Sequence, residues 1–363
     1  MAADYSHLKT RIQGWLFEKV VRYLLRLNDY TIISLDSLAG KAEKYYRDRG
    51  KGLEIRGRGE WHQIDAAGQF QFIPPFVYQI RLLSEAKCYR QTAVGLPIVR
   101  GFVGALKDIS ENYFTDVDDP GNNDYNLRFT DCGAIFSTSG FSDEAENYAF
   151  AHGIKLISYK NLPIMRDITE CIFNFVDSLE SFLPHIAKRE PELRREICNI
   201  LQGSGFNDMR DHSSLPPQLN QHILKLRDIL FEIKFSAVGL AAGGFPVHLV
   251  GTQEFPRKAV AERDQVECHI YHEQGNPFHV RLVDRVWSAY FSVPEVMMSK
   301  FLANREMMVE FKGRSLSFID IPIKINGMRR IIRLELDPKW LEQVRKTAKD
   351  RQSRKQRGAS DKG

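Results

Sequence analysis

Three charged residues, Asp65, Glu85 and Lys87, have types and spacing that could support chemistry. Residues i and i+2 of a strand point to the same side, so Glu85 and Lys87 share one face while Ala86 can enter the core. Asp65 lies 85 − 65 = 20 residues earlier, which is enough for a strand, a turn and a return to the same end of a sheet. The spacing predicts that two carboxylates and one ammonium group converge.

Two converging carboxylates suit a hard divalent cation, so we expect Asp65 and Glu85 to bind Mg²⁺, for which Mn²⁺ can substitute. The metal would hold a phosphate and lower the pKa of a bound water, and Lys87 would orient that water or neutralise charge on the phosphorane. A Glu-x-Lys pair is also common on solvated strand faces. The apolar strand that leads into Glu85, and the Ile64-Asp65 pair one hairpin earlier, favour the site over a surface pair.

Two further polar residues near these positions are candidate substrate contacts. His62 could contact a phosphate or a water, although a histidine in a loop is more often simply solvated. Gln91, one turn after Lys87, could touch the substrate backbone. By contrast, Cys268-His269-x-x-His272 lacks a fourth zinc ligand, and the glycine-rich stretch 239–244 lacks the Gly-Lys-Ser/Thr of a phosphate loop. The latter pattern favours a strand turn or a tight packing site.

The first part of the chain alternates between helical and strand patterns. Ile12, Leu16, Val20 and Leu24 recur every four residues and predict a helix over 6–27. Two strands joined by a turn at Pro74-Pro75 are expected within 53–88, and then a helix at 94–109, a strand at 133–137, a helix at 142–152 that begins near Ser142, and a strand at 155–158. This order predicts an α/β sheet with helices on its faces.

The remainder divides into further units. Residues 1–162 are expected to form the site-bearing domain, 163–202 connecting helices, 203–217 a linker, 218–338 a mainly β (α+β) domain, and 339–363 a basic tail. Candidate strands of the second domain are 231–238, 247–252, 266–272, 279–283 and 331–336, with a helix at 297–309. The sequence does not indicate the role of residues 218–338.

The charge is concentrated at the C-terminal end. The chain of 363 residues has 51 Lys and Arg and 46 Asp and Glu, a net charge of +5. Residues 339–363 contain nine of the basic and three of the acidic residues, so the rest sums to 42 − 43 = −1. Such a body binds nucleic acid only where its basic groups gather on one face. The scattered five cysteines, and the lack of a signal pattern or a long apolar run, predict a cytoplasmic protein outside membranes.

Several motifs within about residues 10–162 resemble the Mrr-like family of restriction endonucleases, within the PD-(D/E)XK nuclease superfamily. They are Phe17-Glu18 on the first helix, His62-Gln63-Ile64-Asp65, Glu85-Ala86-Lys87, and Phe136-Ser137-Thr138-Ser139-Gly140-Phe141 before a helix with Ala145 and Ala149. The family often has glycine where Gln63 stands, so only its His-x-Ile-Asp variant matches here. The resemblance implies a mixed sheet flanked by helices, with Asp65, Glu85 and Lys87 as the catalytic core.

The same resemblance implies that Glu18 lies near the metal and bonds through water, whereas a plain helix-surface pairing with Arg22 is the alternative. It also implies a Mg²⁺-dependent DNA endonuclease in restriction or antiphage defence, acting as a homo-oligomer or with a defence-system partner protein. A structure-specific repair or recombination nuclease, and a non-catalytic DNA-binding subunit of a larger assembly, are the alternatives. The sequence leaves open the cleavage specificity, the choice between DNA and RNA, and any activating signal.

Overall fold

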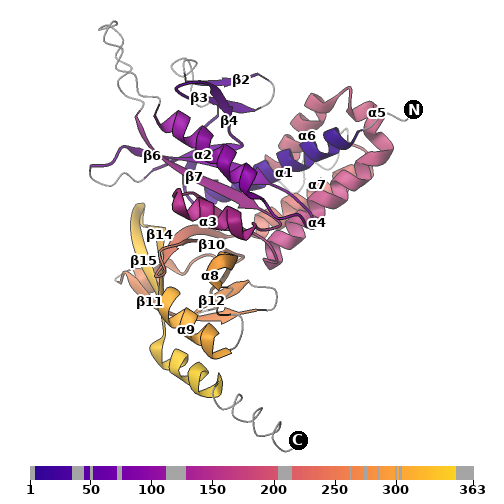
Figure 1. Cartoon of the computed structure of the whole chain (residues 1–363). Coiled ribbons are helices and arrows are strands. Elements are labelled where there is room, and N and C mark those ends of the chain that lie inside the picture. Colours follow the sequence, from indigo (N-terminus) through magenta and orange to yellow (C-terminus); the bar gives the residue numbers. More distant parts are fainter. Residues whose placement is uncertain are drawn as a thin grey trace, which may run out of the picture.

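The computed structural model describes residues 5–34, 45–49, 52–71, 76–111, 128–202, 215–261, 263–273, 277–283, 286–298, 301 and 305–348. Their strands form a five-stranded sheet, a closed barrel and a three-stranded sheet, so the chain is a mixed α and β protein (Figure 1). Among these residues no helix has both the length and the apolar character needed to cross a membrane.

The five-stranded sheet has the order β1-β5-β6-β7-β8. Its strands are β1 (Tyr30–Ile32), β5 (Ala66–Phe70), β6 (Gln79–Lys87), β7 (Phe129–Ser137) and β8 (Lys155–Ser158). The pairs β1–β5 and β5–β6 are antiparallel, whereas β6–β7 and β7–β8 are parallel. The predicted strand pair and the strand at 155–158 are confirmed, and β7 begins four residues before the predicted strand. The proline pair of the expected turn lies outside the described residues.

Helices cover both faces of this sheet, as the alternation of its side chains requires. Helix α1 (Ser6–Leu27) has the predicted bounds and packs on the face that contains Leu82 and Ala86. Helices α2 (Leu96–Ser110) and α3 (Asp143–Ala151) cover the face that contains Leu83 and Ile135. The Ser142 side chain caps α3 by accepting from the Ala145 N–H at 3.3 Å. Both faces of β6 are therefore covered, and Leu82, Leu83 and Ala86 are buried on them.

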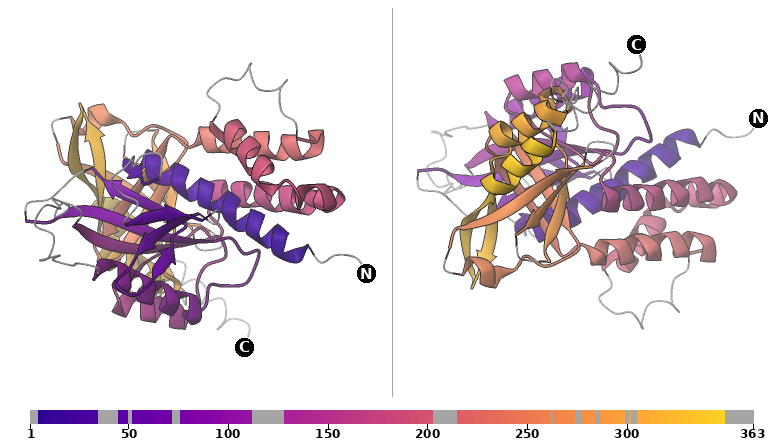
Figure 2. Two further views of the ribbon diagram at one scale, coloured as in Figure 1. Left: turned by 90° about the horizontal axis from the view of Figure 1, so that it is seen from above. Right: turned by 90° about the horizontal axis from the view of Figure 1, so that it is seen from below.

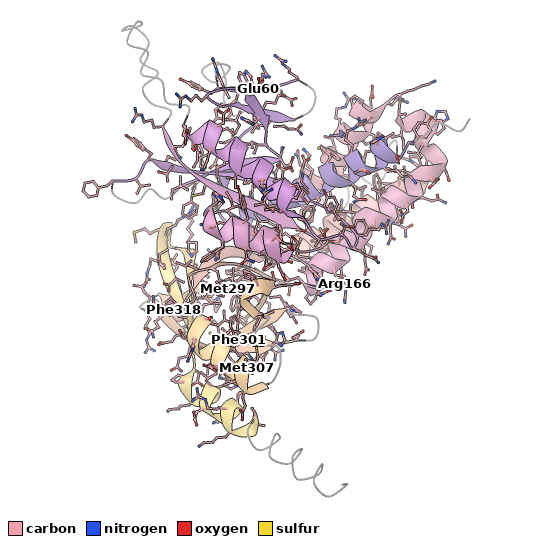
Figure 3. The ribbon with its side chains drawn as sticks, in the orientation of Figure 1. Glu60, Arg166, Met297, Phe301, Met307 and Phe318 are labelled. Carbon is pink, nitrogen blue, oxygen red and sulfur yellow. The ribbon has the colours of Figure 1, made fainter. Side chains whose placement is uncertain are left out.

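A small sheet that the sequence patterns did not predict lies beside α2. It consists of β2 (Tyr46–Asp48), β3 (Leu53–Arg56) and β4 (Trp61–Gln63), all antiparallel. These strands are too short for a clear alternation of polar and apolar residues. Glu60, in the turn before β4, marks the outer side of this sheet in Figure 3.

A layer of helices follows the first sheet. It contains α4 (Pro163–Ser178), the 3-10 helix η2 (Leu179–Phe182), α5 (Leu183–Ile186), α6 (Glu190–Gln202) and α7 (Pro217–Glu232). Residues 203–214, most of the predicted linker, lie outside the described residues. Residues 218–232 were expected to begin a mainly β region, but they belong to α7, whose Leu219, Ile223 and Leu226 are buried in the same core as α1 and α4 (Figure 2).

The C-terminal half contains the seven-stranded barrel, in the order β10-β13-β12-β11-β15-β14-β9. The strands are β9 (Phe235–Ala241), β10 (Pro246–Gly251), β11 (Gln265–His272), β12 (Phe278–Leu282), β13 (Ser288–Phe291), β14 (Phe318–Ile325) and β15 (Met328–Leu336). The predicted helix at 297–309 is instead divided between α8 (Glu295–Met298) and α9 (Arg305–Ser315). Phe301, labelled in Figure 3, contacts Phe311 of α9, with ring centroids 5.1 Å apart. Residues 338–348 are helical, and they include the first part of the predicted basic tail, 339–348.

Polar contacts join the barrel to the five-stranded sheet and its helices. The Tyr159 hydroxyl lies 2.7 Å from His248 Nδ1, and His248 Nε2 lies 2.8 Å from Ser236 Oγ. Ser236 in turn donates to the Leu24 carbonyl at the end of α1, at 3.0 Å. The Glu146 carboxylate of α3 accepts from backbone N–H groups at the start of α8, at 3.0 and 2.6 Å. The barrel is therefore docked on the sheet through groups that are each hydrogen-bonded.

Candidate active site

Asp65 and Glu85 meet at one end of the antiparallel pair β5–β6. The last paired positions at this end are Ala66 and Ser84, so Asp65, one residue earlier, is beside Glu85. Asp65 Oδ2 accepts a hydrogen bond from the Ala86 N–H at 2.8 Å. This bond continues the strand ladder through a side chain, and it fixes the Asp65 carboxylate at the end of β6.

Glu85 and Lys87 share one face of β6, as the strand period predicts. Lys87 Nζ donates to Glu85 Oε1, and the two side chains are 22% and 23% exposed. Both line a hollow of about 280 Å³ whose other wall is formed by α2, at Pro97 and Gly101. The pair is therefore accessible to a ligand but largely removed from bulk water.

Asp65 sits in an environment that opposes its negative charge. Burial is the largest cause, and the neighbouring Glu85 and Glu18 add to it; together they raise the pKa of Asp65 to about 7, against the opposing effects of Lys87 and the Ala86 N–H. For Lys87, burial alone would lower the pKa, but Glu85 and Asp65 outweigh burial and raise it. An ammonium that stays charged beside carboxylates in excess is the arrangement expected of a cation-binding hydrolytic site.

Helix α1 brings Glu18 to the same cluster. Burial raises the pKa of Glu18 although Arg22 and Lys19 lower it, and Glu85 raises it further. Arg22 also contacts the residue that precedes β5. Its Nε and Nη2 donate to the Asp65 carbonyl at 3.0 and 2.6 Å. Helix α1 is therefore attached to the residue that precedes β5, and this attachment sets the position of Glu18 relative to Asp65.

The donor set fits a hard divalent cation with few protein ligands. Within the described residues no three His, Cys, Asp or Glu side chains stand close enough to form a metal cluster among themselves. Mg²⁺ needs less than that, since it commonly keeps several waters and uses one or two carboxylates together with substrate phosphates. Asp65 and Glu85 supply those two carboxylates, and burial of Asp65 beside like charges supplies a reason for a cation to bind.

The two predicted substrate contacts lie differently from the core residues. His62 faces away from the hollow and its Nε2 lies 2.7 Å from Asp108 Oδ2, while Asp108 also accepts from the Gly59 N–H at 3.0 Å. His62 thus attaches the small sheet to the C-terminal part of α2. Gln91 is exposed in the bend after β6 and is absent from the linings of the hollows around Glu85 and Glu18.

Gln63 is the residue that the sequence patterns undervalued. It was noticed only as a departure from a family glycine, yet it lines both the hollow that contains Glu85 and Lys87 and a second groove that contains Glu18. The alternation of β4 was a usable signal, because His62 and Gln63 must point to opposite sides of the strand.

The two discounted motifs have structural roles in the barrel. Cys268 is fully buried in its core, while His269 lies 3.2 Å from the Asp337 carboxylate. At Gly239 an added Cβ would lie 2.7 Å from the Ile321 side chain and 2.8 Å from the Asp320 carbonyl. Tight packing is thus the reason for glycine at position 239. It is one of the two roles, a strand turn or a tight packing site, that the sequence favoured for residues 239–244.

Comparison with known proteins adds little to this geometry. No protein-family model matches the chain, and no curated protein matches it. One solved structure that is similar in part is described as a protein of unknown function, AF1548. It is 17% identical with a TM-score of 0.28, and the match covers 40% of this chain and 59% of the other. The chain therefore spans less than two thirds of that protein's length.

Proposed function

We propose that this chain is a metal-dependent nuclease of the PD-(D/E)XK kind, similar to the Mrr-like endonucleases, which hydrolyses phosphodiester bonds in DNA. The observation that carries the proposal is the convergence of Asp65, Glu85 and Lys87 at one end of β5 and β6, beside Glu18 of α1. Glu85 and Lys87 belong to β6, whereas Asp65 precedes β5 and Glu18 belongs to α1.

Each residue has a distinct task in the proposed reaction. Asp65 and Glu85 would hold the cation, which would supply charge neutralisation at the phosphate and a more acidic water. Lys87 presents its ammonium to the attacking water or to the oxygens on which negative charge develops. Glu18 accepts hydrogen bonds from water at the edge of the cluster, and Arg22 keeps α1 in register with Asp65.

The fold supports this assignment at a coarse level. A mixed sheet with its central strands flanked by helices on both faces suits a restriction-endonuclease-like core. We assign residues 1–162 to that core and the barrel to the selection of substrate or partner, as part of the same proposal. Cytoplasmic defence against foreign DNA is the biological setting that the motif resemblance suggests.

Two other functions remain as competing proposals. A structure-specific repair nuclease would use the same residues and differ only in the nucleic acid that it accepts. A non-catalytic DNA-binding subunit would need no complete catalytic set. The presence of Asp65, Glu85 and Lys87 together favours an enzyme over such a subunit, since a non-catalytic domain has no need to keep all three.

The test is direct incubation of the purified full chain with plasmid DNA, single-stranded DNA and RNA, each with Mg²⁺, with Mn²⁺ and with a chelator. We expect nicking or cutting of DNA that requires the metal. Undiminished cleavage in the chelator, or the absence of cleavage on every substrate with either metal, would remove the proposed activity. The non-catalytic subunit would show binding without cutting.

A further inference from the structure

A groove of about 880 Å³ lies between α1, α6 and the three-stranded sheet. In Figure 1, α6 runs beside the N-terminal half of α1, and ion pairs hold the two helices together. The groove receives side chains from residues almost 180 positions apart, since Arg11 of α1 and Glu190 of α6 are paired across it. The α6 side of the groove belongs to the layer of helices, which contains none of the motifs named from the sequence.

The groove adjoins the candidate active site. Glu18 lines the groove. It lies close enough to Glu85 that the charge of Glu85 raises the pKa of Glu18. Gln63 lines both the groove and the hollow that holds Glu85 and Lys87. A chain molecule with one phosphate at Asp65 and Glu85 would therefore enter this groove with its neighbouring phosphates.

The lining is cationic beyond the proposed metal site. Four lining residues are basic, namely Arg11, Lys19, Arg22 and Arg194, and three are acidic, namely Glu18, Asp48 and Glu190. The lining therefore carries an excess of 4 − 3 = 1 positive charge. Lys19 and Arg194 lie over the same Trp15 ring, 5.1 and 4.9 Å from its centroid, so their charges are held close together.

The size of the groove selects one strand rather than two. A volume of this order is typical of pockets for small ligands, which span roughly 300 to 1,000 Å³. Such a volume has room for a few unpaired nucleotides but not for a base-paired segment with both of its strands.

We infer that the groove between α1 and α6 binds an unpaired stretch of the nucleic-acid strand that adjoins the scissile phosphate, through Arg194, Lys19 and Arg11. This inference rests on the proposed function for the position of the scissile phosphate. It adds a substrate class: duplexes with a single-stranded extension, or single strands. Glu190 restrains the groove's cations, because it accepts from Arg11 and, at 2.9 Å, from Arg194 Nε.

Two substitutions in one ion pair should therefore act in opposite directions. Arg194→Ala removes a phosphate contact and should weaken binding about tenfold, whereas Glu190→Gln removes a negative charge and should strengthen it about threefold. Both are measured by fluorescence anisotropy of the full chain on a labelled duplex with a single-stranded extension. A chelator is present, so that metal-dependent cleavage does not interfere. The salt dependence of binding should become shallower in Arg194→Ala.

Helix α9 offers a matched control, since Arg314 and Glu310 form the same i, i+4 pair at 2.8 Å on the barrel. Arg314→Ala and Glu310→Gln should leave the affinity nearly unchanged. Weaker binding by both Arg194→Ala and Glu190→Gln, with lower thermal stability, would identify the pair as a helix-docking contact and overturn the inference. Equal binding of a blunt duplex, with the same response to both variants, would also overturn it.

Cleavage assays on the same samples separate this inference from the proposed function. Opposite affinity changes in a chain that never cuts DNA would uphold the groove and reject the nuclease. Metal-dependent cutting, with the same affinity in Arg194→Ala and Glu190→Gln as in the natural chain, would support the nuclease activity and reject strand binding in the groove.

Discussion

Asp65 of the five-stranded sheet and His248 of the barrel show two different ways in which a polar group is buried. In the sheet, Asp65 is buried beside two other carboxylates, and its nearest ammonium, Lys87, is already paired with Glu85. In the barrel, the buried His248 is neutral and has a hydrogen-bond partner on each ring nitrogen. Buried charges without full compensation destabilise a fold and mark a site that a ligand completes, whereas satisfied neutral networks mark structure.

The same distinction appears within the sheet itself. Arg81 and Asp131 form a buried pair with Nε–Oδ1 and Nη2–Oδ2 distances of 2.7 and 2.9 Å, and Arg81 also donates to the Tyr46 hydroxyl. The Asp131 side chain is only 1% exposed, and it has a guanidinium of its own. Burial of a charge is therefore insufficient to identify a functional residue; the match between charges decides.

The largest expected effect is on cleavage. Asp65→Asn, Glu85→Gln and Lys87→Ala should each reduce the rate about a hundredfold or more, because each removes a ligand or a charge that no neighbour supplies. Plasmid nicking with Mg²⁺ measures the rate. Asp177→Asn, an exposed carboxylate paired with Arg90, is the control and should cut normally. An Asp65→Asn protein that cuts at the normal rate contradicts the site.

Stability should respond oppositely at the two buried aspartates. Asp131→Asn leaves Arg81 without its carboxylate and should lower the free energy of unfolding by about 3 kcal/mol. Asp65→Asn removes a carboxylate whose pKa burial, Glu85 and Glu18 raise to about 7, so at pH 8 it should be as stable as the natural chain or more stable. Urea unfolding at pH 8 measures both. A comparable loss in the two variants would erase the contrast between them.

The barrel network should make stability depend on pH. Burial lowers the pKa of His248 from 6.5 to about 3, so the unfolded chain binds a proton more readily than the folded chain. The free energy of unfolding should therefore fall as the pH drops below about 6.5, with a loss of roughly 2 kcal/mol from this group by pH 5. His248→Gln should have a smaller difference between urea unfolding at pH 7 and at pH 5. An unchanged difference would show that other groups cause the dependence.

The smallest expected effect concerns the basic C-terminal residues. Truncation after Ala348 removes six Lys and Arg and two Asp and Glu, a charge of +4. Affinity for DNA should fall a few-fold at low salt, with a shallower salt dependence and no change in sequence preference, because charge alone carries no base readout. Anisotropy across a salt series measures this. An unchanged salt slope would indicate that these residues contact something other than nucleic acid.

Local patterns in the sequence were enough to predict much of the first region. Ile12, Leu16, Val20 and Leu24 recur every four residues. This spacing predicted α1 with its observed bounds, since the apolar stripe of such a helix must face a core. Strand alternation likewise placed Glu85 and Lys87 on one face. The start of the second region was misassigned, because the apolar and β-prone residues near Phe231 resemble a strand until α7 is seen to pack on α4.

The sequence by itself determined α1 and the shared strand face of Glu85 and Lys87, because residues of one helix or strand are neighbours by covalent geometry. Tertiary structure decided which distant residues meet. His62 is paired with Asp108, Tyr159 with His248, and Arg11 with Glu190, partners separated by 46, 89 and 179 positions. No local period encodes such pairs, since they depend on how whole elements pack, and they determine which polar groups are satisfied and which stay open to a ligand.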